Sequence, residues 1–151
     1  MIRRFGFFLA ALALAGCGGK SGREAASAVT ARRIVCATPA VAEIVFALGQ
    51  GARVVGVSEF TDWPPDAAAK PQMGSALSPN RERLLALEPD LILSQGKSEI
   101  LGGFAHARGI EFLAFPLDTL DDLRAAIFGF AAALGAEENG RTLWAEMERG
   151  F

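Results

Sequence analysis

The chain has 151 residues, of which 51% are hydrophobic, and its formal net charge is −2. This length and apolar content suit one folded domain with a substantial core. Nucleic-acid binding needs a concentrated cationic face, and the 15 basic residues form no block, so we expect no nucleic-acid partner. One histidine and two cysteines offer almost no metal ligands, and we expect neither a resident metal nor a cofactor.

Residues 1–16 have the pattern of a secretory signal peptide. Two arginines near the start form a positive region, and an apolar run over 5–15 follows. As a helix this run spans about 17 Å, too short for a bilayer core of about 30 Å. Two small residues then precede Cys17, the order typical of a bacterial lipoprotein signal. We expect cleavage before Cys17, acylation of its thiol and attachment to a membrane; an ordinary export signal is the alternative.

Residues 17–32 are rich in glycine, serine, alanine and charge, without a hydrophobic period. This composition predicts a flexible tether, on the order of 20 Å as a random coil. Lipid on Cys17 would leave Cys36 without a disulfide partner. The apolar strand around Cys36 favours a buried structural thiol.

From residue 33 onward, short apolar runs alternate with helical patterns. We predict strands at 33–37, 53–57, 91–93 and 110–115. Between and after them we predict helices from Pro39 to Gly49, from Ser78-Pro79, over 100–108 and from Asp118 to about 134. Strands that alternate with helices imply an α/β fold, an open parallel sheet with helices on both faces.

Single residues predict where these helices begin and which side chains face the core. Thr38 should cap the first one, with Pro39 at its first position, and Asp118 should cap the fourth. In the helix after Ser78-Pro79, we expect the three leucines to face inward. These are Leu84, Leu85 and Leu87.

A last helix is predicted from near Glu137. Its apolar stripe continues up to the last residue of the sequence. The stripe consists of Leu143, Trp144, Met147 and Phe151. The chain therefore has the pattern of a sequence that is cut off rather than finished.

Ligands of open α/β sheets bind outside the carboxyl ends of the strands. No glycine-rich turn follows the first predicted strand, so a dinucleotide or phosphate cradle is not expected. His106 falls within a predicted helix, and no Ser/His/Asp arrangement is credible. We therefore expect a protein that is not an enzyme, with a small exported hydrolase as a minor alternative.

The predicted strand ends offer aromatic surface with a few polar groups. The candidate ligand-binding residues are Thr38, Phe60, Trp63, Gln95 and Lys97. Such a set suits holding a bulky, partly apolar ligand. The alternative for Phe60 and Trp63 is that they pack their loop against the sheet.

Several stretches resemble the helical-backbone substrate-binding proteins of ABC importers, the receptors for iron-siderophores, haem and cobalamin. The strongest likeness is the run 78–93, and weaker ones lie at 33–49, 54–57 and 61–65. The resemblance implies two α/β lobes joined by one long rigid helix. Residues 33–136 would be the N-terminal lobe and 137–151 the start of that helix, with the second lobe absent from the sequence.

The resemblance also implies residue roles. Glu82 matches the exposed glutamate that docks on arginines of the membrane permease, and the helix dipole favours a carboxylate there. The loop with Phe60 and Trp63 matches a segment that approaches the ligand in cobalamin-binding members. Ala76 and Gln95 lie about where such members place further tryptophans.

The implied function is a lipid-anchored periplasmic receptor that passes a metal chelate to an ABC permease. Cobalamin and ferric siderophores rank ahead of haem, because the chain has no tyrosine and His106 is badly placed for an axial ligand. Only Lys97 and Arg81 are basic near the strand ends. The alternatives are a lone-lobe, lipid-anchored protein-interaction module, whose stripe of Leu143, Met147 and Phe151 would need a partner, or a non-functional fragment.

Overall fold

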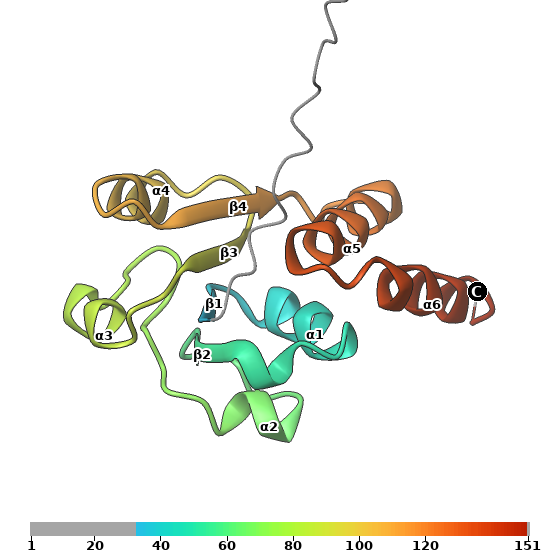
Figure 1. Cartoon of the computed structure of the whole chain (residues 1–151), viewed down its shortest axis with the longest axis horizontal. Coiled ribbons are helices and arrows are strands. Elements are labelled where there is room, and N and C mark those ends of the chain that lie inside the picture. The colour runs from blue at the N-terminus through green and yellow to red at the C-terminus, as the bar shows by residue number, and fades with distance from the viewer. Residues whose placement is uncertain (1–32, 151) are drawn as a thin grey trace, which may run out of the picture.

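The computed structural model describes residues 33–150 (Figure 1). The predicted signal peptide, the tether, Cys17 and Phe151 lie outside these described residues. Over the described range, every helix is too short or too polar to cross a membrane.

Four parallel strands form one sheet in the order β2-β1-β3-β4. They are β1 (Ile34–Cys36), β2 (Val54–Val57), β3 (Leu91–Gln95) and β4 (Glu111–Phe115). The chain steps from β1 outward to β2, then returns past β1 to β3. The direction of winding thus reverses between β1 and β3, and the carboxyl ends of these strands form the topological switch point. The predicted open parallel sheet is confirmed.

Helices cover both faces of the sheet. They are α1 (Pro39–Ala47), α2 (Pro65–Ala68), α3 (Arg81–Ala86), α4 (Glu99–His106), α5 (Leu120–Leu134) and α6 (Glu137–Glu148), with a 3-10 turn, η1 (Gly51–Arg53), before β2. In Figure 1, α3 and α4 lie on the left of the sheet, and α1, α5 and α6 lie on the right. The prediction of a last helix beginning near Glu137 is confirmed.

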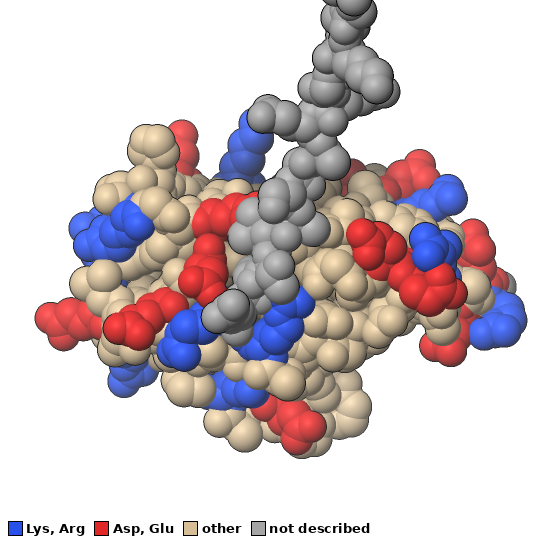
Figure 2. All heavy atoms as spheres, viewed as in Figure 1, with Lys and Arg blue, Asp and Glu red and all other residues tan. Residues whose placement is uncertain are grey.

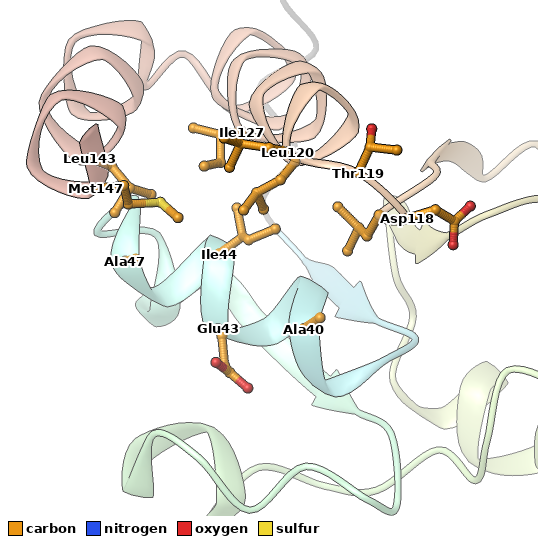
Figure 3. A pocket seen from close by; sticks show the side chains of 12 residues that line it. Ala40, Glu43, Ile44, Ala47, Asp118, Thr119, Leu120, Ile127, Leu143 and Met147 are labelled. Atoms are coloured by element: carbon orange, nitrogen blue, oxygen red, sulfur yellow. The ribbon is translucent and has the colours of Figure 1, made fainter. Parts of the chain in front are cut away.

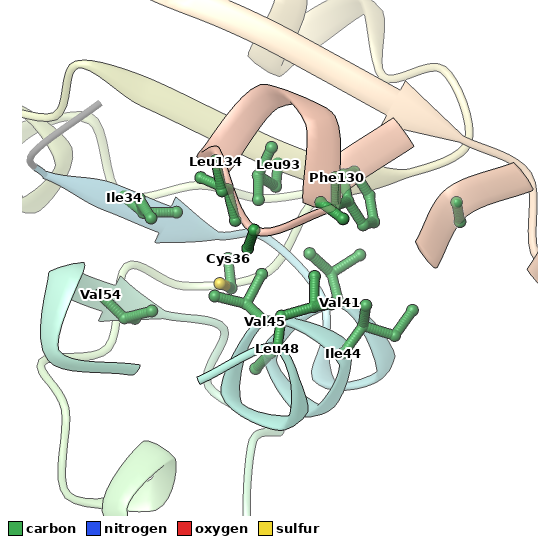
Figure 4. Packing of buried hydrophobic residues seen from close by; sticks show 14 of the residues in the cluster. Ile34, Cys36, Val41, Ile44, Val45, Leu48, Val54, Leu93, Phe130 and Leu134 are labelled. Atoms are coloured by element: carbon green, nitrogen blue, oxygen red, sulfur yellow. The ribbon is translucent and has the colours of Figure 1, made fainter. Parts of the chain in front are cut away.

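Alternation along the strands divides the core between the two faces, because successive strand side chains point to opposite sides. Ile34 and Cys36 belong to the larger cluster with α1 and α5, which Figure 4 shows from close by. Val35 and Ile92 belong to the smaller cluster on the side of α3 and α4. Burial on both faces explains why these strands are continuous apolar runs in the sequence.

Cys36 is a structural residue of the larger cluster. Its side chain is buried, and burial raises the pKa of the thiol from 9.0 to about 12. The thiol therefore stays protonated at neutral pH and packs as a small apolar group. The predicted buried, unpaired thiol is confirmed.

The cap of α5 differs from the prediction. Thr119, not Asp118, is the capping residue: its Oγ1 accepts from the backbone N of Asp122 at 3.1 Å. In return, the backbone N of Thr119 donates to the Asp122 carboxylate at 3.0 Å. This reciprocal capping box needs a side-chain acceptor three residues after the cap. Thr119 and Asp122 form this pair, and the helix begins one residue later than predicted.

The region before β3 also differs. Helix α3 begins after Asn80, whose Oδ1 accepts from the backbone N of Arg83 at 2.9 Å, so Ser78-Pro79 belong to the preceding turn. Leu84 is buried as predicted, but Leu85 is 47% exposed and its predicted inward orientation is wrong. A helix as short as α3 presents one narrow stripe to the sheet, and adjacent residues cannot both lie on it. Helix α2 was not predicted, because four residues carry no periodic signal.

Candidate functional site

The loops at the carboxyl edge of the sheet lie side by side and are tied by hydrogen bonds. The backbone N of Glu59, in the loop after β2, donates to the carbonyl of Gly74 at 3.0 Å. The Ser98 hydroxyl, in the loop after β3, donates to the carbonyl of Ala76 at 3.2 Å. Three segments, 58–60, 74–78 and 96–98, therefore form a connected surface that we name the loop row.

A tight turn holds the middle segment of the loop row. The backbone N of Ser75 donates to the carbonyl of Ser78 at 3.3 Å, and the backbone N of Ser78 donates to the Ser75 hydroxyl at 3.0 Å. Gly74 has a φ of +87°, and a Cβ there would lie 2.7 Å from the carbonyl oxygen of Ser78. The turn consequently requires glycine at position 74.

Phe60 stands in the first segment of the loop row with 68% of its surface exposed. The ring therefore does not hold its loop against the sheet. Ser58 and Thr61 of the same loop are buried, and their hydroxyls are hydrogen-bonded to each other at 3.0 Å. The exposed ring is available to contact a ligand.

Trp63 lies apart from the loop row. It is 61% exposed and lines an open hollow with Glu43 and Phe46 of α1 and with Asp66 of α2. The structure thus separates two aromatic residues that are only three positions apart in the sequence.

Thr38 lies at the switch point, directly after β1, and is the residue before α1. Its backbone is extended, as for a capping residue, but its side chain makes no capping hydrogen bond. The Oγ1 atom is buried and finds no partner among the described residues. An unpaired buried hydroxyl costs about 1–3 kcal/mol, so Thr38 is a destabilising feature of this edge in the unliganded chain.

Gln95 and Lys97 follow at the end of β3. Gln95 is the last residue of that strand and is exposed, and Lys97 is exposed in the loop row. The backbone N of Gly96 donates to the carbonyl of Phe115 at 2.7 Å, which fixes this loop against β4. The structure therefore brings Gln95 and Lys97 to the same edge as Phe60 and Thr38.

Charges near this edge are mixed. Lys97 is accompanied by the exposed carboxylates of Glu59, Asp62 and Asp118, which all lie in loops that follow strands. Figure 2 shows basic and acidic side chains spread among uncharged surface on the face turned to the viewer. Such an edge favours a ligand without a large negative charge.

Glu82 is exposed in the first turn of α3. The neighbouring Arg83 donates to the carbonyl of Gln72 at 3.3 Å and is therefore drawn toward the preceding loop. Among the described residues Glu82 makes no ion pair, and its carboxylate is exposed to solvent.

A second hollow, of about 510 Å³, lies between α1, α5 and α6 (Figure 3). We name it the helix groove. Side chains from the three helices point toward one another across it, among them Ile44, Leu120, Ile127, Leu143 and Met147. Leu143 and Met147 of the predicted stripe pack partly against the core, and Trp144 is buried.

The described residues contain no group of three or more histidine, cysteine or acidic side chains that could hold a metal ion. His106 is exposed in the last turn of α4, at the opposite end of that helix from the loop row.

Residues 34–150 match the profile of the periplasmic binding proteins. The chain belongs to this family. The vitamin B12-binding protein of Pectobacterium carotovorum is 34% identical over 102 residues, which are 64% of this chain and 36% of that protein. The vitamin B12-binding protein of Vibrio cholerae is 39% identical over 64 residues, which are 42% of this chain and 23% of that protein.

Solved structures of this family share the fold. The vitamin B12 binding protein BtuF of Vibrio cholerae has a TM-score of 0.71 at 27% identity, over 80% of this chain and 48% of that one. The haem-binding protein RhuT of Roseiflexus has a TM-score of 0.69 at 32% identity, over 78% of this chain and 46% of that one. The chain thus spans about half of these structures and corresponds to the N-terminal lobe of helical-backbone binding proteins.

Proposed function

We propose that this chain is the N-terminal lobe of a lipid-anchored periplasmic receptor that captures a metal chelate and delivers it to an ABC permease. The observation that carries the proposal is the loop row. Its two outer segments carry the exposed aromatic ring of Phe60 and the exposed Lys97 at the carboxyl edge of the sheet, in a chain of a binding-protein family.

Cobalamin is the first candidate ligand and a ferric siderophore the second. Curated relatives are named for vitamin B12 binding, and the edge carries more carboxylates than cations, which disfavours polyanionic chelates. Haem ranks third although haem-binding structures share the fold, because the sequence has no tyrosine and His106 lies at the far end of α4.

In this proposal residues 1–16 direct export, Cys17 carries the lipid and residues 17–32 are the tether. Residues 33–136 are the N-terminal lobe, and residues 137–151 begin the helix that leads to a second lobe. Thr38, Phe60, Trp63, Gln95 and Lys97 contact the ligand, and Trp63 does so from the flank beside α1.

The decisive experiment is a titration of the full-length protein with cyanocobalamin, followed by tryptophan fluorescence and calorimetry. We expect saturable binding, about tenfold weaker in Phe60→Ala because a large apolar contact is lost. Leu85→Ala, which truncates an exposed residue on α3, is the control and should bind like the wild type. Ferrioxamine and haem are titrated in parallel, and binding of none of the three chelates would contradict the proposal.

The permease contact is tested separately at Glu82. In the full-length protein, Glu82→Lys should reduce cobalamin-dependent growth or uptake at least tenfold, because a cation replaces the carboxylate that pairs with permease arginines. Chelate affinity in solution should stay unchanged. Glu146→Lys, on the exposed side of α6, is the matched charge reversal and should transport normally. Normal transport by Glu82→Lys would remove the docking role.

A further inference from the structure

We propose that Arg33 is a positioning residue for the permease contact: its guanidinium holds the end of α3 and so sets the place of Glu82, which that helix carries. The inference rests on the docking role proposed above for Glu82. It adds a residue at the start of β1, which only the folded chain brings to α3.

Helix α3 is held by little apolar packing. It has six residues, and Leu84 is the one among them that is buried. Glu82 and Leu85 are exposed. A helix this short is marginal by itself and depends on its surroundings for stability. The position of α3 therefore depends on polar contacts at its two ends.

The first end of α3 is tied to the loop before it. The Asn80 side chain accepts from the backbone N of Arg83 at 2.9 Å, and the backbone N of Asn80 donates to the carbonyl of Met73 at 2.8 Å. The Arg83 guanidinium donates to the carbonyl of Gln72 at 3.3 Å. These bonds fix where the helix begins, but one anchored end leaves the direction of a short helix open.

Arg33 ties the other end of α3 to the sheet. Its Nε donates to the carbonyl of Leu87 at 2.9 Å and to that of Glu88 at 3.0 Å, and its Nη2 donates to the carbonyl of Leu87 at 2.7 Å. Carbonyls at a helix end lack partners within the helix and carry the negative pole of its dipole, which favours a cation there. The planar guanidinium suits this place because it presents several donors in a fixed fork.

The backbone at this end of α3 is also strained. Glu88 has a φ of +44°, in the left-handed region that residues other than glycine rarely adopt. Its carbonyl is one of the two that Arg33 holds. Backbone strain persists where surrounding contacts compensate for it. Without the guanidinium, we expect the turn at 87–88 to relax and α3, with Glu82, to change direction.

Arg33→Met isolates the guanidinium from the rest of residue 33. Methionine keeps an unbranched, apolar side chain and has no donor. The main-chain bonds of residue 33 stay in place: its backbone N donates to the Asp90 carboxylate at 3.1 Å, and its carbonyl accepts from the backbone N of Asp90 at 2.9 Å. The variant therefore keeps β1 anchored and removes only the tie to the end of α3.

The test titrates the full-length receptor, loaded with cyanocobalamin, against its permease in proteoliposomes. The receptor concentration that gives half-maximal cyanocobalamin uptake should rise about fivefold in Arg33→Met, because the docking carboxylate is displaced. The dissociation constant for cyanocobalamin should stay unchanged, since α3 lies outside the loop row. Arg141→Met is the matched control: it removes an exposed guanidinium that bonds Glu138 on α6, across the sheet from α3, and should change neither quantity (Figure 1).

Two double variants distinguish positioning from a general loss of stability. In a Glu82→Gln background the docking carboxylate is already gone, so Arg33→Met should cause no further rise in the half-maximal concentration. A general loss of stability would act equally in both backgrounds. Glu88→Gly should bring the Arg33→Met variant back to within about twofold of the wild type, because glycine adopts a φ of +44° without strain.

The outcomes separate this inference from the proposed function. An unchanged half-maximal concentration in Arg33→Met, the same rise in the Glu82→Gln background, or no rescue by Glu88→Gly would each overturn the positioning role and leave the proposed function standing. If Glu82→Gln docks as well as the wild type, the docking role is wrong and the inference fails with it. If the wild type binds none of cyanocobalamin, ferrioxamine and haem, the proposed function itself fails.

Discussion

The loop row and the helix groove both present apolar side chains, yet different forces hold them. In the helix groove, Ile44 and Ile127 are 7% and 1% exposed and belong to the main core. The apolar lining of the groove therefore results from the packing of the helices. In the loop row, Phe60 and Leu77 contribute little to packing, and backbone hydrogen bonds set their positions. Changes in the helix groove should therefore affect stability, and changes in the loop row should affect binding.

The largest effect is expected in the helix groove. Ile127→Ala should lower the free energy of unfolding by about 2–5 kcal/mol, because it removes a buried side chain that both lines the groove and fills the core. Leu120→Ala, in the same groove but 51% exposed, should cost less than about 0.5 kcal/mol. Urea unfolding followed by circular dichroism measures both. Equal losses in the two variants would break the distinction between core and surface within the groove.

A smaller effect is expected at Gly74, where the loop row depends on its backbone. Gly74→Ala should cost about 1–3 kcal/mol, since alanine is strained at a φ of +87° and its Cβ would meet Ser78. It should also weaken chelate binding by displacing the turn. Gly103→Ala is the control: it lies within α4 with no atom near a new Cβ, and it should stabilise the protein by about 0.5–1 kcal/mol. A neutral Gly74→Ala would show that the turn is not a fixed element of the loop row.

The smallest effect is expected at the N-cap of α5, at the rim of the helix groove. Thr119→Ala should cost about 0.5–2 kcal/mol through loss of the capping box of α5, and Thr119→Ser should cost less because it keeps the hydroxyl. Asp118→Ala should be nearly neutral in thermal unfolding, since Asp118 is exposed and is not the cap. A larger loss at Asp118 than at Thr119 would reverse this assignment.

Local sequence patterns were sufficient for most of the architecture. Pro39, the β-branched run around Val35 and the helix that starts at Glu137 each lie where the sequence predicts them. Alternation of strands and helices was enough to predict a parallel sheet covered on both faces. The prediction failed where two local signals compete, as for Asp118 and Thr119, or where the element is too short to have a period, as for α2.

The candidate site was only partly predictable. The rule that ligands bind at the carboxyl ends of parallel strands was sufficient to select Thr38, Phe60, Gln95 and Lys97, and the structure gathers these at one edge. It gave no reason to select the turn at 75–78, because that turn follows no strand. Ala76 and Leu77 stand between two serines there, and the signal that pointed to this turn was the resemblance noted at Ala76.

The sequence by itself determined the order and type of the strands and of the longer helices, because apolar periodicity and capping act within a few residues. Only the tertiary structure decided which loops meet. Glu59 and Gly74, or Ala76 and Ser98, are far apart in the chain, and their hydrogen bonds form once the sheet has brought the loops together. The same long-range packing directs Trp63 toward α1 and leaves Phe60 at the edge, where the ligand is proposed to bind.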